Sequence, residues 1–370
     1  MQLSRRRFFQ TSAIAAAATF AAPEELFGAF EPQRSNPKMD GVILLNSNEN
    51  AYGPLPSMLT AMKDATAQAH RYPNGQALIA RLAEMHKVRP ENIVLGCGSG
   101  EILRMCVEAF TGPEAGVVIA SPTYEAVGRH ARLRGRRVAA VPLNQRYEHD
   151  LDKMAEAAAT QTGLVFICNP NNPTASLTPR KAIENFIAGL KDRQTVLVDE
   201  AYHEFALGSP DYASFLEKPI NSDRVVVART FSKIYGSAGI RVGYAVGPVE
   251  AIRRMREFAL PYGASVIAVA AALAGLNDPA ALNAAIKRNE ADRAEFLRQA
   301  RQRSVAVIPS WGNFAMVDTG RPIREAIDYF ARQKIAIGRP FPPYETHARI
   351  SFGRPDEMQA FWKAWDGMKG

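Results

Sequence analysis

A regular alternation of short apolar runs with helical stretches, from about residue 57 to residue 260, constrains the fold of this chain more than any other feature. The runs that we predict to be buried strands are residues 93–95, 116–120, 138–141, 163–168, 195–198, 224–228 and 242–246. Strands that alternate with helices form a mostly parallel sheet with helices on both faces. The sequence therefore predicts an α/β fold for this part of the chain.

The pattern changes near residue 261, which indicates a second domain. An Ala-rich helical segment comes next, and residues 283–303 have the pattern of a long charged helix. Strand-like segments at 305–308, 313–317 and 348–352 are interleaved with further helices. We therefore expect an N-terminal arm that joins the small domain, a large domain and a smaller α+β domain, over residues 31–56, 57–260 and 261–370 respectively.

The first thirty residues differ from the rest and resemble a twin-arginine export signal. The basic stretch Ser4-Arg5-Arg6-Arg7-Phe8-Phe9 precedes an uncharged, Ala-rich segment over residues 11–22, with a plausible cleavage site after Ala21 or Ala22. This apolar segment is too short to span a bilayer comfortably. We therefore predict a signal peptide over residues 1–30 and an exported, periplasmic protein. The alternative is a disordered basic tail.

Charge and cysteine content exclude several classes of function. The net charge of +8 is compatible with nucleic-acid binding, but the sequence contains no recognised nucleic-acid-binding module, so we expect no nucleic-acid partner. No CxxC motif or spaced histidine pair supports a metal site. Cys97, Cys106 and Cys168 stand in apolar contexts, and we expect buried structural thiols rather than disulfides.

Polar or glycine-rich segments follow four of the predicted strands, at residues 96–101, 169–174, 199–202 and 229–233. Each has an ordinary explanation alone: a turn, a helix cap or a solvated lysine. Residues 96–101 open a helix, and such a turn suits a phosphate. A dinucleotide site would need an acidic residue at the end of the next strand, which this chain lacks. Because ligands bind beyond the carboxyl ends of parallel strands, the four segments together predict one crevice that binds a phosphate without an adjoining ribose.

Three of these segments carry a family resemblance. NPNNPT at 169–174, DEAY at 199–202 and TFSKIYGSAGIRVGY at 230–244 resemble the class I/II aminotransferases of the fold-type I pyridoxal-phosphate (PLP) superfamily. Within that superfamily the chain is most similar to histidinol-phosphate aminotransferases, from Leu44 to Gly353. The resemblance implies PLP as cofactor, a homodimer with shared active sites, and ping-pong exchange of an amino group between an amino acid and a 2-oxo acid.

The resemblance also implies roles for single residues that bind the cofactor. Lys233 would form the internal aldimine and then carry the proton, and Asp199 would pair with the pyridine nitrogen. The phosphate would be held by Ser99, Gly100, Ser232 and Arg241. The ring would be stacked by Tyr124, and its 3-oxygen would accept hydrogen bonds from Asn172 and Tyr202. Tyr72 would reach the cofactor phosphate of the partner chain.

Two arginines near the C-terminus are implied to bind the substrate. Arg349 would hold the α-carboxylate, and Arg339 matches a position that helps to bind the substrate phosphate in histidinol-phosphate enzymes. Residues 340–344, Pro-Phe-Pro-Pro-Tyr, give Arg339 apolar and aromatic surroundings, which predicts an aromatic or otherwise bulky substrate.

The chain departs from the family pattern at three positions, Ala51, Gly100 and Ala175, which leaves the substrate open. Two other functions therefore stay as alternatives. One is a PLP-dependent decarboxylase or lyase on the same fold, and the other is a non-enzymatic PLP-binding protein.

Overall fold

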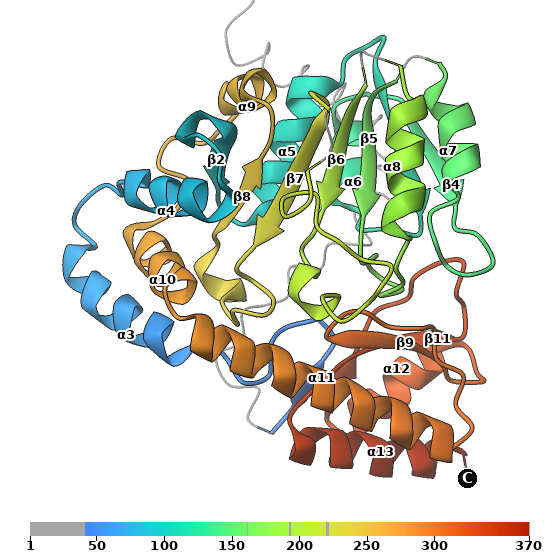
Figure 1. Cartoon of the computed structure of the whole chain (residues 1–370). Helices are drawn as coiled ribbons and strands as arrows, with labels where there is room; N and C mark the ends of the chain where they lie inside the picture. The colour runs from blue at the N-terminus through green and yellow to red at the C-terminus, as the bar shows by residue number, and fades with distance from the viewer. Residues whose placement is uncertain (1–40, 161, 192–193, 220–221, 370) are drawn as a thin grey trace, which may run out of the picture. The chain divides into compact units, whose positions relative to one another are not determined.

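A seven-stranded sheet forms the centre of the computed structural model (Figure 1). Its strands, in spatial order, are β2 (Ile93–Gly96), β8 (Gly243–Val246), β7 (Val225–Thr230), β6 (Thr195–Asp199), β5 (Thr162–Cys168), β3 (Gly116–Ser121) and β4 (Val138–Pro142). The strand β8 is antiparallel to both of its neighbours, and every other pair is parallel. All seven predicted strands and the mostly parallel α/β fold are therefore confirmed.

The central strands are apolar throughout because helices cover both faces of the sheet. Leu164 and Phe166 of β5 pack in one hydrophobic cluster, with side chains from α5 (Ser99–Phe110), α6 (Ala126–Leu133) and α9 (Val249–Arg256). Val165 and Ile167 pack in another, with side chains from α7 (Leu151–Ala158) and α8 (Arg180–Gly189). Alternate residues of one strand thus enter two separate cores, which leaves the ends of the strands as the place for polar residues.

The C-terminal part contains two small sheets and a third core. The predicted strands at 313–317 and 348–352 are confirmed as β9 (Phe314–Asp318) and β11 (His347–Ser351), and the two pair antiparallel. The predicted strand at residues 305–308 is wrong, because only Val307 forms an isolated bridge there, to Val317. The sequence analysis also missed β1 (Ile43–Leu45) and β10 (Ile335–Ile337), which pair in parallel.

The remaining helices complete the fold. The long charged helix is α11 (Pro279–Gln302), and α12 (Ile323–Arg332) and α13 (Pro355–Lys369) pack near its C-terminal half, where aromatic side chains of α11, α12 and α13 form the third core. The Ala-rich helix is α10 (Val266–Leu276), which packs against α3 (Pro56–Ala65) and α4 (Gln76–His86) (Figure 1). The division of the chain at residue 260 stays a prediction.

The structure describes residues 41–160, 162–191, 194–219 and 222–369. Residues 43–370 form one unit and residues 1–42 another. The predicted export signal therefore lies outside the described residues. Within the described ranges, no single helix is long and apolar enough to cross a membrane; α10 and α11 pass such a test only as a pair, across a bend of 82°.

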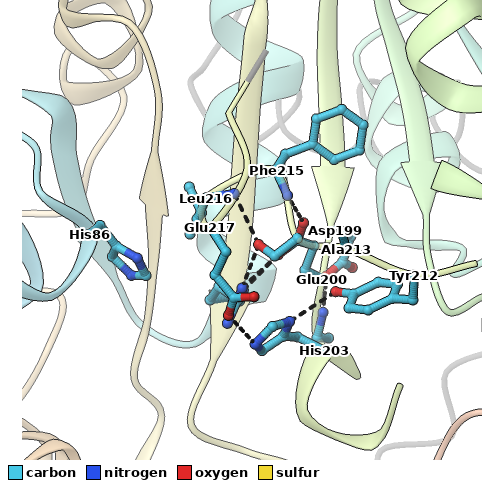
Figure 2. Close-up of polar contacts among 12 residues, drawn as sticks. His86, Asp199, Glu200, His203, Tyr212, Ala213, Phe215, Leu216 and Glu217 are labelled. Atoms are coloured by element: carbon cyan, nitrogen blue, oxygen red, sulfur yellow. Dashed lines mark hydrogen bonds and ion pairs between the residues drawn. The ribbon is translucent and has the colours of Figure 1, made fainter. Parts of the chain in front are cut away.

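A buried ion pair joins the carboxyl ends of β6 and β7. Glu200 follows β6 and is 1% exposed, and Arg229 near the end of β7 is 6% exposed. Their nearest charged atoms, Arg229 Nη2 and Glu200 Oε2, lie 2.8 Å apart. Ser214 Oγ and the backbone N–H of Phe215 donate further hydrogen bonds to Glu200, at 2.7 and 2.8 Å. Figure 2 shows Glu200 with Phe215 beside a second group of contacts, in which His203 bonds Tyr212 and Glu217.

Replacing Arg229 by methionine should destabilise the fold strongly, because the Glu200 carboxylate would stay buried without its cation. Breaking a buried pair in this way costs about 3–5 kcal/mol. The matched control is Arg253→Met, which removes exposed ion pairs with Glu250 and Glu257, where the loss should be about 1 kcal/mol or less for each pair. Urea unfolding measures the free energy of unfolding of both variants. Equal losses of this free energy would show that the buried pair does not hold the strand ends together.

Candidate active site

A cavity of about 140 Å³ lies at the carboxyl edge of the seven-stranded sheet. Its lining comprises Ser99, Gly100, Tyr124, Cys168, Asn172, Asp199, Ala201, Tyr202, Thr230, Ser232, Lys233, Ala238 and Arg241. Nine of the residues predicted to bind the cofactor are therefore in one cavity: Ser99, Gly100, Tyr124, Asn172, Asp199, Tyr202, Ser232, Lys233 and Arg241.

The direction of the strands explains why these residues meet. The strands β5, β6 and β7 are parallel, so the segments that follow them leave the sheet at the same edge. Arg241 instead precedes β8, and because β8 runs in the opposite direction, its first residues lie at that edge too. The single reversed strand therefore adds an arginine to a set of residues that otherwise follow strands.

One end of the cavity is suited to an anion. Ser99 and Gly100 form the first turn of α5, whose backbone N–H groups and dipole favour negative charge. The guanidinium of Arg241 closely approaches Gly98, the residue before this turn: a Cβ atom on Gly98 would clash with it, and the φ of Gly98 is +73°. Arg241 Nη1 also donates a hydrogen bond to Ser232 Oγ at 3.4 Å. A helix N-terminus, a hydroxyl and an arginine therefore converge on one point.

Lys233 lines the same cavity and is partly buried as a residue. Its Nζ donates to the carbonyl oxygens of Ser47 and Asn48, at 3.4 and 3.2 Å. Burial is the main cause that lowers the pKa of Lys233 to about 8, and Arg349 and Arg241 also lower it. Burial and Arg349 contribute more to this lowering of the Lys233 pKa than Arg241 does. Lys233 can therefore act as a nucleophile and as a proton carrier near neutral pH.

The carboxyl of Asp199 is 2% exposed at the end of β6. It accepts a hydrogen bond from the backbone N–H of Ala201 at 3.1 Å. Burial raises its pKa to about 7, while that hydrogen bond and Lys233 oppose the rise. A carboxyl in this state gains from a cationic partner, so Asp199 could bind a protonated ring nitrogen.

Arg349 on β11 is buried beside Asn172. Its Nη1 donates to Asn172 Oδ1 at 2.8 Å, and its Nη2 donates to the carbonyl of Asn46 at 2.6 Å. Within the described part of the chain, its Nε is buried without a hydrogen-bond acceptor. Burial is the main cause that lowers the pKa of Arg349 to about 10. The arrangement leaves one buried donor that a carboxylate could satisfy.

Three of the predicted residues do not line the cavity. Arg349 still bonds the lining residue Asn172, whereas Tyr72 and Arg339 have other partners. Tyr72 is 80% exposed, and its ring stacks on that of Tyr262 with 4.5 Å between the centroids. Arg339 lies outside the lining and forms an ion pair with Glu125, the residue after Tyr124. The structure thus separates these two side chains from the residues around Lys233.

The sequence analysis missed Asn48, which connects the N-terminal segment to the cavity. Asn48 Nδ2 donates to the hydroxyl of Tyr202 at 3.0 Å, and its backbone N–H donates to Ser351 Oγ at 2.7 Å. Its φ is +53°, a left-handed conformation that asparagine tolerates better than most residues. The run Asn46-Ser47-Asn48-Glu49-Asn50 is polar after a short apolar stretch, which was the available signal.

Thiols and metal ligands add little to this site. Cys106 and Cys168 are buried as predicted, whereas Cys97 is only partly buried, and all three are free. Across the residues that the structure describes, no group of three or more His, Cys, Asp or Glu side chains could hold a metal ion.

Comparisons with known proteins agree with this geometry. The sequence model of the family "Aminotransferase class I and II" matches residues 40–364. The chain is 38% identical to an aromatic amino acid aminotransferase of Nocardia farcinica, over 90% of this chain and 92% of that protein. It is 35% identical to histidinol-phosphate aminotransferase 2 of Methylococcus capsulatus, over 88% of this chain and 90% of that protein.

A solved structure shares the fold as well as the sequence pattern. The histidinol-phosphate aminotransferase of Sinorhizobium meliloti, in complex with pyridoxal-5'-phosphate, superimposes with a TM-score of 0.82 at 28% identity, over 96% of each chain. With its strand order, its cavity of lysine, aspartate and anion-binding groups, and a family match along nearly the whole described length, this chain belongs to the class I and II aminotransferases.

Proposed function

We propose that this PLP-dependent aminotransferase moves an amino group from an aromatic or otherwise bulky amino acid, or from histidinol phosphate, to a 2-oxo acid. The single observation that carries the proposal is the cavity in which the Lys233 amine and the Asp199 carboxyl lie with an anion-binding turn. The names of the two relatives, one aromatic and one histidinol-phosphate aminotransferase, support the two substrate classes.

The residues of the cavity fit the cofactor by their chemistry. The α5 N-terminus, Ser232 and Arg241 would hold the phosphate, because all three present donors to an anion. Asp199 would bind the ring nitrogen, and Tyr124 would cover the ring. When bound, the cofactor supplies an aldehyde and an electron-withdrawing ring that accepts the electron pair released at the substrate Cα.

The protein's own groups then position the substrate and move protons. Lys233 with a pKa of about 8 would take the proton from the substrate Cα and return it, because its neutral form is accessible near pH 7–8. The charged carboxylate of Asp199 would keep the ring nitrogen protonated. Asn172 and Tyr202 would donate hydrogen bonds at the ring's 3-oxygen. Arg349 would bind the substrate carboxylate through its Nε–H and a second N–H of the same guanidinium.

A homodimer is part of the proposal. Tyr72 is highly exposed, stacks on the exposed Tyr262, and stays outside the cavity of its own chain, which supports a role at the cavity of a partner chain. Sedimentation of the active enzyme tests this, and a catalytically competent monomer would reject it.

Export to the periplasm by the twin-arginine pathway is also proposed, from the basic run Arg5-Arg6-Arg7 and the Ala-rich segment that follows. This pathway carries folded proteins, so the cofactor would be loaded before export. Conversion of all three arginines to lysine should leave active enzyme in the cytoplasm, and unchanged export of that variant would reject the proposed signal.

The first prediction for this function concerns Lys233. Borohydride reduction of the holoenzyme should fix the cofactor on the peptide that contains Lys233, and Lys233→Ala should lose this adduct. Because only the neutral amine attacks an aldehyde, the rate of cofactor attachment to the apoenzyme should rise about tenfold per pH unit and level off above pH 8. A lysine with an ordinary pKa would still show a rising rate up to pH 10. Lys181, which is exposed, is the control position, and labelling there would contradict the assignment.

The second prediction concerns Arg349 and the type of reaction. Mixing holoenzyme with phenylalanine, tyrosine or histidine should convert the cofactor to its amine form, as an absorbance change shows; a decarboxylase or lyase would turn over without it. Arg349→Lys should lower kcat/KM for every α-amino acid by roughly 10²-fold, since charge-assisted bidentate contacts are worth about 1.5–3 kcal/mol. An undiminished kcat/KM in this variant would show that the carboxylate binds elsewhere.

A further inference from the structure

Arg339 forms a surface ion pair whose partner, Glu125, the sequence does not identify. Arg339 Nη2 lies 2.5 Å from Glu125 Oε1, and the two side chains are 42% and 51% exposed. Glu125 precedes α6 and directly follows Tyr124, which lines the cavity. The ion pair therefore connects the loop after β3 with the segment between β10 and β11, at the margin of the cavity.

Arg339 and Arg349 contact the same aromatic ring. The guanidinium carbon of Arg339 lies 4.2 Å from the centroid of Phe341, and that of Arg349 lies 4.7 Å from it. The charges of both Arg339 and Glu125 also act on the pKa of Arg349, in opposite directions. Both members of the ion pair are therefore close enough to influence an anion that binds to Arg349.

The charges at this place favour one kind of substrate head group. Arg349 contributes one positive charge and retains a buried N–H donor without an acceptor among the described residues. Arg339 contributes a second positive charge, but Glu125 already neutralises it. The three side chains together carry +1, which balances a carboxylate. A phosphate monoester carries about −1.5 to −2 at pH 7 and would need both arginines.

We infer that Glu125 is a specificity-determining residue: by pairing with Arg339, it adjusts the site to a singly charged α-carboxylate and disfavours a doubly charged phosphate monoester. This inference rests on the proposed aminotransferase function and deepens it, because it chooses between the two substrate classes named there. The wild-type enzyme then prefers aromatic amino acids, and histidinol phosphate is a poor substrate because Glu125 both occupies Arg339 and repels the second negative charge.

The test is Glu125→Gln, which keeps the size of the side chain and removes its charge. The measured quantity is kcat/KM for histidinol phosphate divided by kcat/KM for phenylalanine. This ratio should rise by up to about fivefold, the upper end of what an exposed ion pair contributes, and the rise should appear in KM. Inorganic phosphate should also compete with phenylalanine at lower concentrations in this variant than in the wild type.

Two further variants separate specific from general effects. Glu345→Gln removes an exposed carboxylate from the same segment between Arg339 and Arg349, and it should leave the ratio unchanged. In the double variant Glu125→Gln with Arg339→Gln, the rise in the kcat/KM ratio should disappear, because the guanidinium that Glu125→Gln frees from its ion pair is no longer present. An unchanged ratio in Glu125→Gln, an equal rise in Glu345→Gln, or a gain that survives in the double variant would each overturn the inference. A wild type that prefers histidinol phosphate to phenylalanine would also overturn the inference. If the wild type converts neither an amino acid nor histidinol phosphate, the proposed function fails instead, which is a different result.

Discussion

The buried ion pair between Glu200 and Arg229 fixes the distance between the two groups on which the chemistry depends. Glu200 directly follows Asp199 at the end of β6, and Arg229 comes four residues before Lys233 at the end of β7. Each charge is desolvated, and a shift of either strand end would leave it without its partner. Ser214 and Phe215 complete the hydrogen bonding of the carboxylate, so a third segment is held at the same point. The Asp199 carboxyl and the Lys233 amine are therefore attached to strand ends that are held rigidly together.

Burial acts on these two groups in opposite directions. It raises the pKa of Asp199 to about 7 and lowers that of Lys233 to about 8, so both stand close to neutral pH, although an exposed aspartate and an exposed lysine differ by more than six pKa units. Such pairs are typical of sites that move protons. The charge of a bound molecule can decide the protonation state of Asp199 or Lys233, because the pKa of each group lies close to neutral pH.

The local pattern of the sequence was sufficient for the sheet and for most of the cavity, because each strand and the polar segment after it are continuous in the chain. The pattern was insufficient where structure depends on distant partners. The strands β1 and β10 are three residues each and have no period to detect, and only their pairing makes them strands. Residues 305–308 have a strand composition but only one bridged residue. Glu200 belongs to the DEAY motif and Arg229 directly precedes the motif that starts at Thr230, but nothing in the sequence showed that the two side chains face each other.

Because of the contacts of Asn48, the active site can be completed only after most of the chain has been synthesised. Asn48 bonds Ser351 and Asn313, and β1 pairs with β10, so the segment before the sheet is held by residues about three hundred positions later. At a ribosomal rate of roughly 5–20 residues per second, the emerging chain lacks these partners for a quarter of a minute to a minute. The large sheet, formed between residues 93 and 246, has all its strands long before that. A nascent chain can thus hold Asp199 and Lys233 in place while the carbonyl groups that face the lysine are still unattached, and full order arrives only with the last tenth of the polypeptide.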